Sequence, residues 1–303
     1  MLNILNLIRW KNLLMIAIVQ ILIKYALFPA FAIDITLNGL GFSLLILATI
    51  CIAAGGYVIN DIYDVDTDAV NKPDKVIIGK AISEKNANIL YMIFTCIGVF
   101  LGFYLSNSIG RPPFFILFII ISALLYVYAS YLKQIAVVGN IVVSILVALS
   151  LLIVGIFELI PAITEQNQNV QSTMFEVLAD FAIFAFLINF IREIVKDIQD
   201  VDGDYKAEMQ TLPIVFGKER TAKITFGLTI VIILVLIYYI ATFLFMHMEV
   251  VIYFLVAVVG PLIYIAIKLF TAEKKQHFKH ISLILKVTMI TGMLSMVLYR
   301  FIF

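Results

Sequence analysis

The side chains best suited to chemistry in this chain gather in two acidic stretches. The first runs from Asn60 to Asp68 and carries aspartates at positions 61, 64, 66 and 68, directly after an apolar run. Residues 197–204 repeat its pattern, D-I-x-D-V-D-x-D, with every acid in register. Residues three or four apart share one face of an α-helix, so each stretch predicts one acidic face, from which Asp66 and Asp202 point away.

Two stacked acidic faces need a cation. Carboxylates one helical turn apart repel each other by roughly a few tenths of a kcal/mol in water, and more strongly beside a membrane. Oxygen ligands of this kind suit Mg²⁺, which proteins usually share with substrate phosphate oxygens. We therefore predict Mg²⁺ as the cofactor, bound between the two faces together with a diphosphate. The predicted metal-binding residues are Asn60, Asp61, Asp64, Asp68, Asp197, Asp200 and Asp204.

Basic and amide side chains close to the acids are candidates for contacting the diphosphate directly. They could bind phosphate oxygens through charge-assisted hydrogen bonds. The alternative for Arg192 and Lys196 is a structural one, in which they pair with neighbouring acids such as Glu193 and Asp200. Lys75, close to Lys72, is one further basic candidate. The predicted diphosphate-binding residues are Asn12, Lys72, Lys133, Arg192 and Lys196.

The acids also have two simpler interpretations. The D-x-D-x-D spacing is that of a calcium-binding EF-hand loop, but that loop requires Gly at its sixth position and Glu at its twelfth. The first stretch has Ala69 and Lys75 there, and the second has Tyr205 and Thr211. A run of charges is commonly just a solvated loop, which we expect for Asp66, Asp74 and Asp202 but not for two clusters in identical register.

The elements that must position these acids are membrane helices. The 303 residues are 63% hydrophobic and only 14% charged, whereas soluble domains carry about one-quarter charged residues. Apolar runs of about 20 residues, enough to span a bilayer as a helix, occur nine times. The fold class predicted is therefore an all-α polytopic membrane protein. The nine spans are predicted at residues 13–33, 39–59, 87–105, 114–132, 137–160, 178–195, 221–245, 250–270 and 281–303.

The distribution of basic residues predicts how these helices lie in the membrane. All 21 Lys and Arg residues except Lys24, Arg111 and Arg300 fall in or beside alternate loops on one side, which the positive-inside rule assigns to the cytoplasm. The N-terminus and both acidic stretches share that side. Lys24, inside the first span, is either a functional intramembrane charge or a side chain that snorkels to the interface.

The repeated acids also predict an internal repeat. The segment Val76-Ile77-Ile78-Gly79-Lys80 after the first stretch is echoed by Ile214-Val215-Phe216-Gly217-Lys218 after the second. Four spans separate the copies, so both have the same orientation. We expect one domain over residues 1–303, built of two parallel four-helix repeats, at about 1–136 and 137–280, plus a ninth helix.

The motifs resemble those of the UbiA superfamily of intramembrane prenyltransferases. The matching residues are Asn60, Asp64 and Asp68 in the first motif and Asp200 and Asp204 in the second, and the resemblance covers essentially the whole chain. Residues 192–204, followed by Thr-Leu-Pro-Ile at 211–214, most resemble the digeranylgeranylglyceryl phosphate synthase branch. One departure lies at residues 71–75, Asn-Lys-Pro-Asp-Lys, where relatives usually carry an Asn-Arg-Pro-x-Arg-Pro segment. Another is the step from Tyr128 to Lys133, which is longer than the one in quinone-forming relatives.

The resemblance implies a Mg²⁺-dependent transfer of a polyprenyl group, such as geranylgeranyl, from its diphosphate to a membrane-associated acceptor. Its catalytic residues would be Asp64, Asp68, Asp200 and Asp204. The favoured acceptor is a prenylglyceryl phosphate lipid, and the alternative is a hydroxybenzoate or dihydroxynaphthoate ring of quinone biosynthesis. Its partners are these substrates and the bilayer of the plasma or inner membrane, with no nucleic acid. A function of another class, divalent cation transport, is less favoured because transporter sites usually lie near the bilayer midplane.

Overall fold

The computed structural model describes the backbone of residues 2–302 and the side chains of residues 2–299, so the Arg300 side chain lies outside the described part. Within these residues the chain is helical, without β-strands. Nine helical segments in this range are long and apolar enough to cross a membrane, and each overlaps one predicted span. They are Trp10–Ala30, Gly39–Tyr63, Glu84–Ser108, Pro112–Ser130, Val138–Ala162, Gln168–Lys206, Lys218–Leu244, Met248–Phe270 and Lys275–Tyr299.

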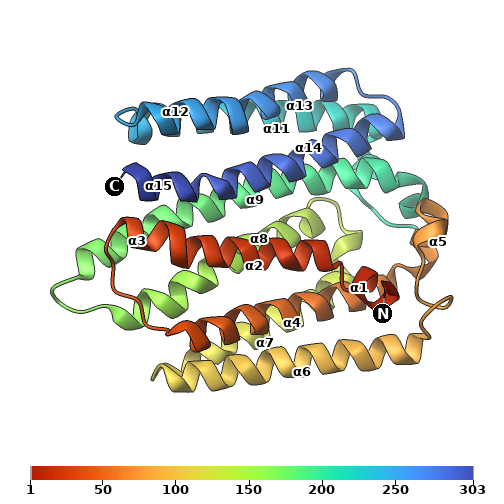
Figure 1. The fold of residues 1–303 in the computed structure, drawn as a ribbon. Helices are drawn as coiled ribbons and strands as arrows, with labels where there is room; N and C mark the ends of the chain where they lie inside the picture. The colour runs from red at the N-terminus through yellow and green to blue at the C-terminus, as the bar shows by residue number, and fades with distance from the viewer. Residues whose placement is uncertain (1, 303) are drawn as a thin grey trace.

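These segments run side by side and form one bundle (Figure 1). The main helices are α2 (Trp10–Leu22), α4 (Gly39–Tyr63), α6 (Glu84–Ser108), α7 (Phe115–Ser130), α8 (Val138–Glu158), α9 (Gln168–Lys206), α11 (Lys218–Tyr239), α13 (Gly260–Phe270) and α14 (Lys275–Leu294). Shorter helices extend or connect them: α1 (Leu2–Leu7), α3 (Phe28–Ala30), α5 (Val65–Asn71), α10 (Leu212–Phe216), α12 (Met248–Phe254) and α15 (Met296–Ile302). Helix α5 and the N-terminus lie at the same end of the bundle (Figure 1), which we call the site end.

Small residues let the helices approach each other closely. A Cβ atom on Gly98 of α6 would lie 2.5 Å from the side chain of Ile52 and 3.1 Å from the backbone oxygen of Ala48, both on α4. Close contact of this kind is a main source of helix association in lipid, where burial of apolar surface gives little driving force. One apolar core surrounds Phe42, Phe118 and Phe157, and a second lies between α9, α11, α13 and α14.

The far end of the bundle contains a buried ion pair. Lys24 and Glu158 are 3% and 0% exposed, and Lys24 Nζ lies 2.6 Å from Glu158 Oε1. The backbone of Leu37 completes the group, because its N–H donates to Glu158 Oε2 and its carbonyl accepts from Lys24. Lys24 therefore does not snorkel to the interface; it joins the first span to α8.

One backbone detail agrees with the predicted repeat. Gly79 and Gly217, the glycines of the two Gly-Lys pairs, have φ angles of +81° and +85°, a conformation that side-chain-bearing residues rarely adopt. Each precedes a spanning helix, α6 or α11. The division into two parallel repeats stays a prediction, which this shared turn supports.

Candidate active site

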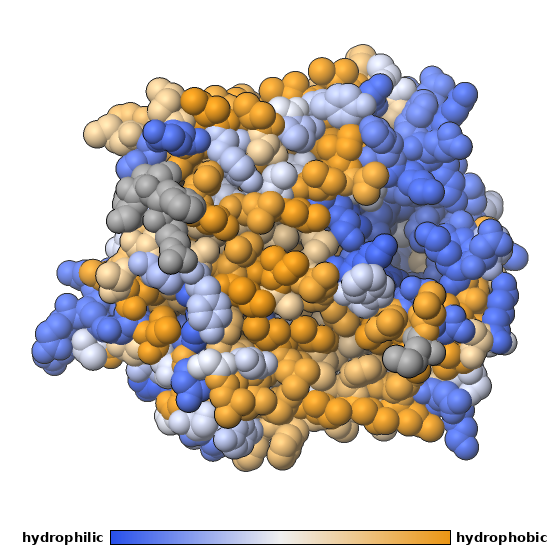
Figure 2. Space-filling view, in the orientation of Figure 1, coloured by the Kyte–Doolittle hydropathy of each residue, from blue (hydrophilic) through white to orange (hydrophobic). Residues whose placement is uncertain are grey.

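A cavity of about 450 Å³ opens at the site end and extends into the bundle. Figure 2 shows hydrophilic residues gathered around a hollow at this end, next to a broad apolar surface. Every residue predicted for the site except Asp61 lines this cavity. Those residues are Asn12, Asn60, Asp64, Asp68, Lys72, Lys133, Arg192, Lys196, Asp197, Asp200 and Asp204.

The first acidic stretch forms one wall, where α4 gives way to α5. Helix α4 ends at Tyr63, and Asp64 links it to α5 with a slightly altered backbone. Asn60 Nδ2 donates to Asp64 Oδ2 over 2.5 Å. Lys133, from the short turn after α7, places its ammonium 2.5 Å from Asp64 Oδ1. The predicted face of Asn60, Asp64 and Asp68 is therefore present, with one lysine already bound to it.

The second acidic stretch forms the opposite wall and lies on α9, which continues unbroken through all its acids. Asp197 Oδ2 accepts a hydrogen bond from Asn140 Nδ2 of α8 at 2.8 Å. Asp204, only 7% exposed, accepts one from Thr211 Oγ1 at 3.2 Å. Asn140 and Thr211 are neutral donors that orient the acids without cancelling their charge.

Lys72 connects the two walls. Its ammonium lies 2.6 Å from Asp200 Oδ2 and 3.7 Å from Asp68 Oδ1. Burial alone would lower the pKa of Lys72, but the carboxylates of Asp200 and Asp68 together more than offset this, so the net pKa is raised and the side chain stays charged. Burial also raises the pKa of Asp68, against the opposing charge of Lys72.

Asn71, the residue before Lys72, joins α5 directly to α9. The Asn71 side chain accepts from the backbone N–H of Gly203 at 3.0 Å and donates to the backbone oxygen of Asp200 at 2.7 Å. A Cβ atom on Gly203 would lie 2.3 Å from Asn71 Nδ2 and 2.7 Å from the backbone oxygen of Thr67. Only glycine lets α5 approach α9 this closely, so Gly203 sets the spacing between the two acidic walls.

Asp61 differs from the other predicted ligands. Its Oδ1 lies 2.7 Å from a guanidinium nitrogen of Arg9, and it does not line the main cavity. Helical periodicity placed Asp61 near the same face, but it could not reveal a partner from the segment between α1 and α2. Its role as a metal ligand stays a prediction, with Arg9 as a competing cation. Asp66 is exposed, as expected for a residue off the face.

A second basic group lies deeper in the cavity. Arg192 and Lys196 both pair with Glu193, at 3.1 and 2.8 Å, which is the structural alternative considered above for these two bases. Lys286 of α14 donates to Asn12 Oδ1 at 2.9 Å. The sequence analysis counted Lys286 among the basic residues beside the loops and missed its role, although a lysine within the predicted span 281–303 is a feature that marks functional sites in membrane proteins.

The acids suit a metal that is shared with its substrate. In the described residues no group of three or more acidic, His or Cys side chains is close enough to hold a metal ion by itself. Instead, oxygen ligands from two walls face each other, and the ammonium of Lys72 lies between them as a cation would. Mg²⁺ usually binds one or two carboxylates together with substrate phosphates, not an all-protein cage. The donor set therefore fits Mg²⁺ in company with a phosphate group.

Fold and cavity together define a multi-spanning membrane protein with an acidic mouth above an apolar chamber. The sequence pattern of the UbiA prenyltransferase family matches residues 17–285. The digeranylgeranylglyceryl phosphate synthase of Methanosphaera stadtmanae is 30% identical over 258 residues, which cover 83% of this chain and 86% of that protein. The chain therefore belongs to the UbiA prenyltransferase family and is a membrane prenyltransferase.

Solved structures agree with this fold. One described as digeranylgeranylglyceryl phosphate synthase superposes with a TM-score of 0.67 at 24% identity, covering 99% of this chain and 98% of the other. A UbiA homolog from Archaeoglobus fulgidus, bound to GPP and Mg²⁺, gives a TM-score of 0.53 at 16% identity, with 97% and 99% of the two chains covered. The nine-helix architecture is thus that of known UbiA proteins.

Proposed function

We propose that this chain transfers a geranylgeranyl group from its diphosphate to the hydroxyl of a prenylglyceryl phosphate lipid, with Mg²⁺ as the cofactor. The observation that carries the proposal is the pair of acidic walls at the mouth of a largely apolar cavity. The name of the Methanosphaera relative supports the glyceryl phosphate acceptor. The GPP and Mg²⁺ bound to the Archaeoglobus homolog support a prenyl diphosphate donor and the metal.

In this proposal Asp64 and Asp68 on one wall and Asp200 and Asp204 on the other hold the metal. Bound Mg²⁺ would neutralise the diphosphate and make it a better leaving group. Lys72 and Lys133 pair with these acids, so their ammonium groups are close enough to turn toward phosphate oxygens and stabilise the same charge.

In this reaction the protein binds the two substrates, aligns them and excludes water. The allylic carbon–oxygen bond breaks and its electron pair leaves with the diphosphate. The acceptor hydroxyl oxygen then bonds to that carbon, and its proton passes to an oxygen of the released diphosphate. Apolar side chains such as Leu146, Ile188 and Met289 line the cavity below the acids, and they keep water from competing with the acceptor.

The length of the cavity favours a long isoprenoid tail. Its lining follows α9 from Asp200 to Asp180, a distance of about 30 Å at the rise of an α-helix. Near Asp180 the hydroxyl of Tyr239 donates to the carboxylate at 2.9 Å. We propose that the tail of the donor lies along this stretch of α9.

We further propose that the site end faces the cytoplasm and that the protein resides in the plasma or inner membrane. The concentration of Lys and Arg residues at this end supports the orientation. Single cysteines introduced at Lys80 and at Arg111 into a chain without Cys51 and Cys96 test it. We expect a membrane-impermeant thiol reagent to label intact cells only at position 111; labelling at position 80 instead would reverse the orientation.

The acceptor and the class of function are tested by one assay. Purified protein in lipid nanodiscs receives labelled geranylgeranyl diphosphate, Mg²⁺ and either a prenylglyceryl phosphate, a hydroxybenzoate or a dihydroxynaphthoate. We expect product with the glyceryl phosphate. Product with an aromatic compound alone would show that the acceptor is aromatic and not a glyceryl phosphate. Mg²⁺ flux into vesicles without any prenyl transfer would support the transport alternative, which family membership disfavours.

A further inference from the structure

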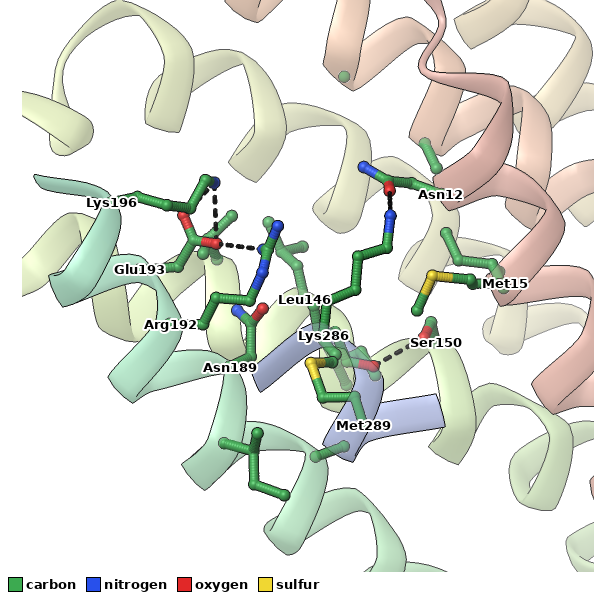
Figure 3. Close-up of a pocket in the computed structure, with 18 of the residues that line it drawn as sticks. Asn12, Met15, Leu146, Ser150, Asn189, Arg192, Glu193, Lys196, Lys286 and Met289 are labelled. Carbon is green, nitrogen blue, oxygen red and sulfur yellow. Dashed lines mark hydrogen bonds and ion pairs between the residues drawn. The ribbon is translucent and has the colours of Figure 1, made fainter. Parts of the chain in front are cut away.

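Lys286 is a charged side chain within a spanning helix, and the reaction described so far does not use it. Its ammonium lines the cavity and donates to Asn12 Oδ1 over 2.9 Å. Among the described side chains it forms no ion pair with a carboxylate. Figure 3 shows Lys286 and Asn12 reaching toward each other, with Arg192 on the neighbouring α9. A membrane-embedded lysine without a counter-charge is costly and usually functional.

The surroundings of Lys286 are positively charged. Arg192 and Lys196 share one carboxylate, Glu193, and both line the same cavity as Lys286. Three cations and one carboxylate leave an excess of about two positive charges. The next acid along α9, Asp197, accepts a hydrogen bond from Asn140 of α8, and the ion pairs of Arg192 and Lys196 are with Glu193 instead.

A buried donor in the same group also lacks a partner. Arg192 Nε is inaccessible to solvent and makes no hydrogen bond among the described residues. An unsatisfied buried donor is costly, so a ligand that accepts a hydrogen bond from it binds more favourably. Charge and hydrogen bonding thus both favour an anion beside Arg192 and Lys286.

This group is separate from the lysines at the mouth. Lys72 pairs with Asp200, whereas Arg192 precedes Asp200 by eight residues, or about 12 Å along the helix axis. An anion bound at Arg192 and Lys286 therefore lies two helical turns deeper than one bound at Lys72. The lining of the cavity includes both positions.

We propose that Lys286, Asn12 and Arg192 form a second anion subsite, which binds the phosphate monoester of the acceptor. A phosphate monoester carries about −1.5 to −2 charges at neutral pH, which matches the excess of positive charge; a carboxylate carries only one. The free hydroxyl of a prenylglyceryl phosphate lies on the same glycerol unit as its phosphate. Anchoring the phosphate here aims that hydroxyl at the bond to be broken. The inference rests on the proposed function, because it assumes a phosphorylated acceptor.

The experiment compares Lys286→Met, Lys286→Arg and the wild type in nanodiscs. The KM for the phosphorylated acceptor is expected to rise about 10- to 100-fold in Lys286→Met, with little change in the KM for geranylgeranyl diphosphate, and Lys286→Arg should restore most of the loss. The exposed Lys279, on the same helix but outside the cavity, supplies the control Lys279→Met, which should behave as wild type. Without donor and Mg²⁺, the phosphorylated acceptor should raise the Tm of the wild type but not of Lys286→Met.

Each outcome decides between the proposals. A prenylglycerol without phosphate should be used equally poorly by wild type and Lys286→Met, because neither can form the contact between Lys286 and the acceptor phosphate. A rise in the KM for the donor instead would assign Lys286 to the diphosphate and overturn the inference, as would an unchanged KM for the acceptor. If the wild type uses only aromatic acceptors, the proposed function fails first, and the Tm shift with the prenylglyceryl phosphate is expected to be absent in every variant.

Discussion

The two acidic walls carry matching acids, but the protein holds them in different ways. On the first wall the helix is interrupted at Asp64, and lysines from loop segments pair with Asp64 and Asp68. On the second wall α9 is continuous; Asp197 and Asp204 accept hydrogen bonds from neutral side chains, and Asp200 pairs with the same Lys72. Lys133 therefore neutralises charge on the first wall alone, whereas Lys72 is shared by both walls. Because the second wall lies on an unbroken helix, we expect α9 to fix the position of a metal and α5 to adjust to it.

The largest effect should follow from removing an acid from either wall. Asp200→Ala and Asp64→Ala are each expected to lower prenyl transfer by more than about 100-fold, since loss of groups that merely orient metal ligands already costs about 10- to 100-fold. Asp202→Ala is the matched control, because Asp202 is 66% exposed and its ion pair among the described side chains is with the exposed Lys218. Full activity in Asp200→Ala, measured by product formation at saturating donor, would rule out a metal-assisted role for α9.

The spacing between the walls should matter almost as much as the acids. Gly203→Ala introduces a methyl group against Asn71 and Thr67, and overpacking of this kind costs about 1–3 kcal/mol. We expect a lower Tm and an activity loss of about 10- to 100-fold, because α5 must move away from α9. Gly227→Ala is the control: a Cβ there meets nothing within 4 Å, so the Tm should hold or rise slightly. Equal behaviour of the two variants would contradict the role of Gly203 in setting the distance between α5 and α9.

Lys72 should affect donor binding more than chemistry. Lys72→Met removes the charge that lies between Asp68 and Asp200, and a hydrogen bond to a charged group is worth about 1.5–3 kcal/mol. The KM for geranylgeranyl diphosphate should therefore rise by about 10- to 100-fold. Lys75→Met, which changes an exposed lysine outside the main cavity, should leave it unchanged. A normal donor KM in Lys72→Met would show that the lysine is only a partner for the acids.

The smallest effect is expected where a neutral donor orients an acid of α9. Thr211→Val keeps the shape of the side chain but removes the 3.2 Å hydrogen bond to Asp204. The Mg²⁺ concentration that gives half-maximal activity should increase by up to about tenfold, the low end of what loss of such partners costs. Thr271→Val, at an exposed position after α13, is the control. An unchanged Mg²⁺ dependence in Thr211→Val would mean that Asp204 needs no orientation.

Sequence patterns predicted the helices well because the signal is local. Runs of apolar residues located all nine segments, and helical periodicity grouped the acids that now line one cavity. Contacts between distant segments could not be predicted in this way. Arg9 meets Asp61, Asn71 meets Gly203, and Lys286 meets Asn12 only because the bundle packs them together. The sequence contains each of these residues but does not show which of them lie close together in the fold.

The length of α9 has a consequence for how substrates reach the site. Its 39 residues extend about 58 Å, whereas the hydrocarbon core of a bilayer is about 30 Å thick. The acids of α9 follow the apolar part predicted at residues 178–195 and lie on the helical turns just beyond it. The acids would then stand at the depth of the lipid headgroups, where a prenyl diphosphate and a lipid phosphate already keep their polar ends. Both reactants could arrive, and the product depart, by lateral diffusion within one leaflet.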